Sequence, residues 1–202
     1  MPISERPEEY GCVILAAGLG RRFGGGKLLA QFDGQPLYRR VMDAVPVEAR
    51  GRTAVVSGDA DILAAAAERG YRPVENLLPE AGISRSIRRG LEALEGCAGV
   101  LFMVGDQPLL RRETTEALLT AARENPGCIV APVRSGGKTG NPCFFPARFF
   151  PELLALEGDT GGRRVMAAHP EAVVTLPVSD RELTDTDSPQ ALAALESRSS
   201  SL

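Results

Sequence analysis

The residues of this chain best suited to chemistry lie in a glycine-rich loop that also carries positive charge. Glycines and cationic side chains alternate in it: Gly18, Gly20, Arg21, Arg22, Gly24, Gly25, Gly26 and Lys27. Glycine lets the backbone approach a ligand and turn its N–H groups inward, and guanidinium and ammonium groups attract anions. The loop follows an apolar run over 12–17, which predicts a strand buried on both faces. A strand that ends in such a loop indicates a phosphate-binding site, with a plain tight turn as the alternative.

The spacing within the loop does not match two well-known phosphate-binding fingerprints. A P-loop would need glycine in place of Arg21 and a hydroxyl residue in place of Leu28. The dinucleotide fingerprint G-x-G-x-x-G, begun at Gly18, would need glycine in place of Phe23. These mismatches argue against a P-loop enzyme and against a nicotinamide-dependent oxidoreductase.

A single acid follows a second apolar run at 100–104, within Gly105-Asp106-Gln107-Pro108. The carboxyl ends of the strands form the ligand-binding edge of an open α/β sheet. A carboxylate there is costly unless it is solvated, caps a helix or coordinates a cation. Hard cations that bridge phosphates take carboxylate oxygens, so Asp106 is a candidate magnesium ligand. The alternative is a cap on the helix that follows Pro108.

Two further acids, Asp185 and Asp187, flank one residue near the end of the chain. If this stretch is extended, both side chains point to the same side. The alternative is that Asp187 or Ser188 only caps the last helix. His169, the only histidine, has no second histidine or cysteine nearby and is predicted to be a surface residue.

Alternating strand and helix patterns must position these residues. Strands are predicted at 12–17, 53–57, 71–74, 100–104 and 128–132, and helices from Gln35, at 59–69, 83–94 and 112–124, and from Ser188. This alternation predicts an α/β fold, a three-layer sandwich with a mostly parallel sheet. We expect a single domain over 1–202, with flexible ends at 1–9 and 197–202.

The composition limits the classes of protein to consider. The 202 residues carry a formal net charge of −3, which argues against a nucleic-acid binder. The N-terminus lacks the layout of a signal peptide, and no apolar run reaches membrane-spanning length. Four cysteines without a C-x-x-C pair favour reduced thiols over a thiolate metal site. We therefore expect a cytoplasmic protein that binds neither nucleic acid nor membranes.

The glycine-rich segment resembles the signature loop of Rossmann-like nucleotidyltransferases, most closely that of the molybdenum cofactor cytidylyltransferases and their guanylyltransferase relatives. The matches to L-A-A-G-x-G-x-R-F-G-x-x-K-L are Leu15, Ala16, Ala17, Gly18, Gly20, Arg22, Phe23, Gly24, Lys27 and Leu28. The resemblance implies a nucleotide-diphospho-sugar transferase-like fold and a loop that wraps an NTP triphosphate. It also implies that Arg22 and Lys27 neutralise the phosphate charge, and that Asp106 binds the metal.

A second family-like stretch runs from Asn76 to Ser86. Gly82, Ser84 and Ser86 match a G-x-S-x-S motif that contacts the base and ribose in that family. The resemblance therefore adds Asn76, Gly82, Ser84 and Ser86 to the nucleotide-binding residues. A helix N-cap is the alternative role for Ser84.

The acceptor side rests on two further stretches. Gly140-Asn141-Pro142 resembles a G-H-P motif near the acceptor pocket, with Asn141 in place of histidine. The loop 158–163 resembles G-D-x-G-A-R, with Gly162 in place of alanine, and adds Asp159. Turns formed by Gly, Asn, Pro and Asp are the alternative for both.

The segment that begins at Asp185 resembles the family's D-I-D-T-P-E-D-L, which implies that Asp185 or Asp187 completes the magnesium site with Asp106. The resemblance as a whole implies transfer of CMP from CTP to molybdopterin that carries molybdenum, with release of pyrophosphate. Because the acceptor is a phosphate monoester, no protein nucleophile is needed, and catalysis is positioning and charge neutralisation by Arg22, Lys27 and Asp106. A molybdoenzyme that receives the cofactor is a further implied partner. The alternatives are another phosphate acceptor such as a sugar phosphate, a guanylyltransferase that uses GTP, and a non-catalytic cofactor chaperone.

Overall fold

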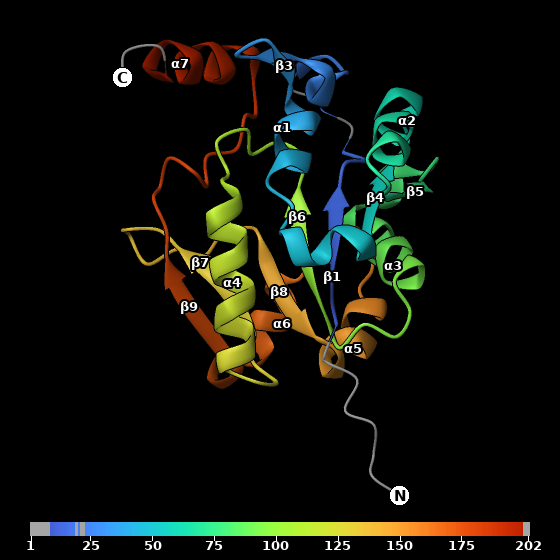
Figure 1. Ribbon diagram of the computed structural model, residues 1–202, viewed down its shortest axis with the longest axis vertical. Helices are drawn as coiled ribbons and strands as arrows, with labels where there is room; N and C mark the ends of the chain where they lie inside the picture. The colour runs from blue at the N-terminus through green and yellow to red at the C-terminus, as the bar shows by residue number, and fades with distance from the viewer. Residues whose placement is uncertain (1–8, 19, 21–22, 200–202) are drawn as a thin grey trace, which may run out of the picture.

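The computed structural model describes residues 9–18, 20 and 23–199, which form a seven-stranded sheet of order β5-β4-β1-β6-β8-β7-β9 (Figure 1). Its strands are β1 (Tyr10–Leu15), β4 (Thr53–Ser57), β5 (Arg72–Glu75), β6 (Gly99–Val104), β7 (Ile129–Val133), β8 (Cys143–Pro146) and β9 (Val173–Pro177). Neighbouring strands from β5 to β6 are parallel, as are β7 and β9, whereas β8 is antiparallel to both of its neighbours. The prediction of an α/β fold with a mostly parallel sheet is confirmed.

Helices cover both faces of this sheet. One core contains side chains of α1 (Leu37–Asp43), α2 (Ala60–Glu68) and α4 (Arg112–Glu124), and the other contains side chains of α3 (Ile83–Ala93), α5 (Phe150–Leu154) and α6 (Arg163–Ala168). Strand β1 serves both, because Cys12 and Ile14 face the first core and Val13 faces the second. These layers match the predicted three-layer sandwich.

Shorter elements complete the fold. The hairpin of β2 (Gln31–Phe32) and β3 (Gln35–Pro36) packs with α7 (Pro189–Ser199) around Phe32, Leu37, Leu192 and Leu195. The 3₁₀ turns are η2 (Lys27–Leu29), η3 (Val47–Arg52), η4 (Pro79–Ala81), η5 (Ala147–Phe149) and η6 (Pro170–Ala172). No helix in the described part of the chain has the length and apolar character to cross a membrane.

Several expected boundaries differ from the structure. The helix predicted from Gln35 begins at Leu37, because Gln35 and Pro36 pair with β2. Strands β8 and β9 were not predicted from the sequence, since both are short and β9 is partly exposed. Helix α7 includes residues 197–199, which belong to the end that we expected to be flexible. At the other end, the carbonyl of Glu9 accepts a hydrogen bond from Ala98 N. Residues 1–8 and 200–202 lie outside the described residues.

The register of the central strands positions the site. Strands β1 and β6 are parallel neighbours with Leu15 opposite Val104, so the segments that follow them leave the sheet at the same edge. Figure 1 shows both arrowheads directed toward the end of the molecule that carries β3 and α7. The glycine-rich loop after β1 and Asp106 after β6 are therefore neighbours, as expected for the carboxyl edge of an open α/β sheet.

Candidate active site

The centre of the site is an ammonium group shared by two acids. Lys27 Nζ lies 2.6 Å from Asp106 Oδ2 and 3.2 Å from Asp187 Oδ1. Asp106 follows β6 and Asp187 precedes α7, so three segments far apart in the sequence meet at one point. The Lys27 side chain is 12% exposed, which places its charge mostly inside the protein. The structure thus brings together three of the predicted site residues.

The glycine-rich loop is what allows Lys27 to reach the two acids. Gly20 has a φ of 54°, and a Cβ there would lie 2.9 Å from Lys27 Cβ. A side chain at Gly20 would therefore displace the start of η2. Gly26, with a φ of 62°, directly precedes Lys27 and turns the chain into η2. The predicted cations Arg21 and Arg22 lie outside the described residues.

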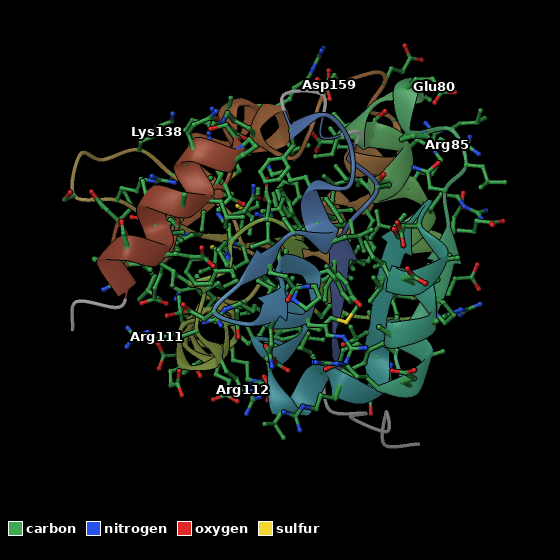
Figure 2. The ribbon with its side chains drawn as sticks, turned by 90° about the horizontal axis from the view of Figure 1, so that it is seen from above. Glu80, Arg85, Arg111, Arg112, Lys138 and Asp159 are labelled. Carbon is green, nitrogen blue, oxygen red and sulfur yellow. The ribbon has the colours of Figure 1, made fainter. Side chains whose placement is uncertain are left out.

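A pocket of about 570 Å³ opens above this edge of the sheet. Ten of the predicted residues line it: Leu15, Ala17, Gly18, Gly20, Lys27, Gly82, Ser86, Asp106, Asp159 and Asp187. Asp159 was assigned to the acceptor side from the sequence, yet it lies in this larger pocket. Figure 2, which looks onto this end of the molecule, shows Asp159 and Glu80 on the same side of it. Leu28, which matched the loop motif but was not predicted as a site residue, also lines the pocket. Glu80 and Ile83 line it as well and were not predicted from the sequence.

Three predicted nucleotide-binding residues lie behind the wall of the pocket rather than on it. Ala16 is 4% exposed and belongs to a hydrophobic core. Asn76 is fully buried, and its Nδ2 donates to Ser86 Oγ at 3.0 Å, while its Oδ1 accepts from Leu78 N and Arg85 Nε. Asn76 therefore links the segment before α3 to the first turns of that helix by hydrogen bonds. The third residue, Ser84, is likewise buried.

Gly82, not Ser84, caps helix α3, so the N-cap role considered for Ser84 is wrong. Gly82 has a φ of 91°, and Ser84 N donates to the carbonyl of Gly158 at 3.2 Å. A Cβ on Gly82 would lie 2.2 Å from the carbonyl carbon of Gly158. The start of α3 is thus pressed directly against the loop that carries Asp159.

The segment that carries Asp185 and Asp187 is hydrogen-bonded to the residues that follow β6. Thr186 donates from both its backbone N and its Oγ1 to the carbonyl of Asp106, each at 3.1 Å. Gln107 Nε2 donates to Asp185 Oδ1 at 3.0 Å. Glu182 anchors the segment further along, since it accepts hydrogen bonds from Arg111 and Thr114.

The capping roles considered for these acids are also resolved. Helix α4 begins at Arg112 with Arg111 as its N-cap, so Asp106 does not cap it. Ser188 Oγ accepts from Ala191 N at 3.1 Å at the start of α7, whereas the Asp187 carboxylate contacts Lys27. Asp185 does not line the large pocket.

The surroundings shift two pKa values at this point. Partial burial alone would lower the pKa of Lys27, but the Asp106 carboxylate outweighs it and raises that pKa above its ordinary value. Burial of the carboxyl, and then the charge of Asp106, raises the pKa of Asp185. Lys27 is therefore held as a cation.

A smaller cavity of about 190 Å³ adjoins the large pocket and shares Leu15, Ile83 and Val104 with it. Its other walls are mainly apolar: Ile87, Phe102, Phe145, Leu153 and Met166. The predicted acceptor residues Gly140 and Asn141 line it, but Pro142 does not, and Arg163 provides a cation. Burial raises the pKa of the Cys143 thiol to about 12, so this wall residue is neutral.

These features define what the site can do chemically. A glycine loop, a lysine and two acids at a sheet edge suit a polyphosphate and a hard cation. The described residues contain no cluster of three or more His, Cys, Asp or Glu side chains suited to a metal. The two acids converge on one cationic group, so a metal here would take its remaining ligands from phosphate and water.

Known proteins share this fold and part of this sequence. Over 189 residues, the chain is 31% identical to the bifunctional protein GlmU of Anaeromyxobacter sp. (strain K). The aligned stretch covers 83% of this chain and 37% of that protein. The structure of Rv0371c from Mycobacterium tuberculosis H37Rv has a TM-score of 0.76 at 23% identity, covering 94% of this chain and 98% of Rv0371c. That protein is also known in complex with manganese.

A CTP complex of CMP:2-keto-3-deoxy-manno-octonic acid synthetase has a TM-score of 0.76 at 14% identity, covering 96% of this chain and 99% of that one. At these identities the two solved structures show a common fold. The chain spans little more than a third of the GlmU relative, so their similarity concerns one part of that protein. The family model described as the MobA-like NTP transferase domain matches residues 12–173, which include the glycine loop and Asp106. By this match, the chain belongs to the family of MobA-like NTP transferase domains.

Proposed function

We propose that this protein is a nucleotidyltransferase that transfers CMP from CTP to molybdopterin carrying molybdenum, with release of pyrophosphate. The observation that carries the proposal is the position of the Lys27 ammonium between Asp106 and Asp187, where the glycine loop ends. This arrangement supplies one cation for a triphosphate and two carboxylates for a metal. Family membership supports the use of an NTP.

In the proposed reaction the protein binds and orients two anionic substrates. The phosphate oxygen of the acceptor attacks the α-phosphorus of CTP, the bond between the α-phosphorus and the bridging oxygen breaks, and pyrophosphate leaves with that electron pair. The acceptor oxygen is already anionic near neutral pH, so no side chain has to remove its proton. Lys27 holds the triphosphate and neutralises the charge that develops on the leaving group. Arg22 is proposed to assist it on the strength of the sequence resemblance.

Asp106 and Asp187 are the residues proposed to hold a divalent cation, and we expect Mg²⁺. Their carboxylate oxygens already share one cationic partner, which is the arrangement such an ion needs. A cation held by these two residues would supply positive charge that offsets the negative charge of the phosphates. Asp185 is proposed as a supporting acid, since Gln107 orients its carboxylate.

The smaller cavity supports an acceptor with a flat ring system, whose faces can pack against the apolar walls of Ile87, Phe102 and Phe145. Asn141 and Arg163 can pair with polar groups at the edge of such a ring, whose burial without partners would be costly. The second candidate function, transfer to a sugar phosphate or another sugar-derived acceptor, is favoured by the fold shared with the CTP complex of CMP:2-keto-3-deoxy-manno-octonic acid synthetase.

The choice of base is proposed to depend on Ala17, whose methyl group lies in the pocket wall. One methyl group changes selectivity by about 1–3 kcal/mol, so Ala17→Gly should narrow the preference for CTP over GTP without abolishing it.

The test is a pyrophosphate-release assay with CTP, GTP, ATP and UTP in turn, each offered molybdopterin carrying molybdenum or a hexose 1-phosphate. We expect the highest kcat/KM with CTP and molybdopterin. A preference for GTP would overturn the choice of base, a preference for the hexose phosphate would overturn the acceptor, and binding of cofactor without any turnover would favour a chaperone.

A further inference from the structure

Lys27 occupies the position between Asp106 and Asp187 that a metal would take. Its Nζ lies at hydrogen-bond distance from both carboxylates, 2.6 Å and 3.2 Å. Charge-assisted hydrogen bonds of this kind are about twice as strong as neutral ones. A divalent cation that enters this pair of acids must therefore break the short contact with Asp106 and the longer one with Asp187, and it meets the positive charge of the ammonium as well.

The same ammonium is needed elsewhere once a nucleotide binds. In the proposed function Lys27 holds the triphosphate. Among the residues that the structure describes, no atom lies within 4 Å of a Cβ placed on Gly18, Gly24, Gly25 or Gly26, so these glycines are not packed against that part of the chain. Lys27 begins η2, and its carbonyl accepts a hydrogen bond from Ala30 N, so the flexible four-carbon side chain has to make the movement.

The two acids are held near each other by contacts that do not involve Lys27. Thr186, next to Asp187, donates two hydrogen bonds to the backbone carbonyl of Asp106. The backbone segments that carry the two carboxylates therefore stay side by side when the ammonium leaves. The two carboxylates form a pair that is neutralised by lysine in one state and is available to a divalent cation in the other.

We propose that Lys27 sets the order in which the site fills, a role that rests on the proposed function. Its ammonium closes the metal position by pairing with Asp106 and Asp187. An anionic triphosphate draws the ammonium toward the glycine loop and so exposes the two carboxylates to a divalent cation. The metal thus enters with the nucleotide, and metal alone competes with lysine.

The test measures binding of Mn²⁺ alone, from the loss of the free-ion electron paramagnetic resonance signal, to the full chain. Lys27→Met should bind Mn²⁺ about tenfold or more tightly than the wild type, since a hydrogen bond to a charged group contributes about 1.5–3 kcal/mol. Mn²⁺ should also raise the Tm of Lys27→Met more than that of the wild type. The matched control is Lys138→Met, because Lys138 is exposed and lies away from the pocket (Figure 2). Its Mn²⁺ affinity should equal that of the wild type.

Equal or weaker Mn²⁺ binding by Lys27→Met would overturn the proposal. If Lys27→Met does not fold, Lys27→Gln replaces it, with the same expected and contrary results. A second arm measures Mn²⁺ binding to the wild type with CTP present, where tighter binding is expected. Tight binding there, without a gain in Lys27→Met alone, would reject the binding order but leave the proposed function standing. Absence of binding to any NTP, with or without Mn²⁺, would reject both.

Discussion

The Gly82→Ala variant tests whether the close contact between the start of α3 and the loop that carries Asp159 stabilises the fold. Gly82 has a φ of 91° and a ψ of 172°, a region that residues other than glycine rarely enter. A Cβ there would lie 2.2 Å from the carbonyl carbon and oxygen of Gly158 and 2.6 Å from the N of Asp159. These are backbone atoms, so no side-chain rotation relieves the overlap.

The expected loss of stability follows from these two effects. Backbone strain at such a position contributes about 1–3 kcal/mol, and forced repacking contributes about 1–3 kcal/mol more. The free energy of unfolding of Gly82→Ala should thus fall by roughly 2–6 kcal/mol. For a chain of this size, each kcal/mol lowers Tm by about 2–4 °C, so the Tm should fall by at least about 4 °C.

Gly158→Ala is the matched control on the other side of the contact. Gly158 also has a positive φ, 59°, but a Cβ there would meet no atom of the described residues within 4 Å. Gly158→Ala should therefore lose only about 1–2 kcal/mol of unfolding free energy, which is what left-handed backbone costs a residue with a Cβ. Alanine also reduces the conformational entropy of the unfolded chain, which offsets part of this loss. Thermal unfolding by calorimetry and CTP binding by titration measure both variants. A Tm loss in Gly82→Ala no larger than in Gly158→Ala would show that the close approach does not stabilise the fold.

Three further variants test the metal acid, the anchor of the C-terminal segment and the cavity. Asp106→Asn should lower kcat by a factor that corresponds to several kcal/mol with little change in Tm, and turnover at the wild-type rate would refute its role at the metal. Burial raises the pKa of Glu182, but hydrogen bonds from Arg111 and Thr114 outweigh burial and leave that pKa below its ordinary value. Its stabilisation is thus present above about pH 4.3 and is lost as the pH falls through the lowered pKa, so Glu182→Gln should flatten the dependence of unfolding free energy on pH in that acidic range. Gly162→Ala places a Cβ 2.6 Å from Phe145 Cζ, so it should raise the KM for the acceptor and leave CTP binding unchanged. In the control Gly161→Ala, the new Cβ would lie 3.7 Å from the Ile83 side chain, which is ordinary contact. An equal rise in acceptor KM in the two variants would contradict the prediction.

The sequence was sufficient to predict the part of the site that depends on parallel strands. An apolar run followed by a glycine loop, and another followed by Asp106, must end at one edge of such a sheet. That rule placed Lys27 and Asp106 at the same edge of the sheet, and the adjacent positions of β1 and β6 in the strand order then bring them together.

Other features depended on contacts that no local pattern encodes. The approach of Lys27 to Asp187 joins residues 160 positions apart. Glu80 lines the pocket because η4 places it there, and Asn76 and Ser84 are buried by the packing of α3 against its neighbours. Strand β8 runs antiparallel between β6 and β7, and its four residues carry no alternation that distinguishes them from a loop motif.

The central claim is attack at the α-phosphorus of an NTP, and isotopic labelling tests it most directly. The protein would be incubated with Mg²⁺, molybdopterin carrying molybdenum, and CTP labelled at the α-phosphate or, separately, at the γ-phosphate. Our account predicts that the α-label passes to the acceptor and the γ-label appears in pyrophosphate, with both products much reduced in Asp106→Asn. Release of the γ-label as inorganic phosphate, or transfer of the γ-label to the acceptor, would contradict it.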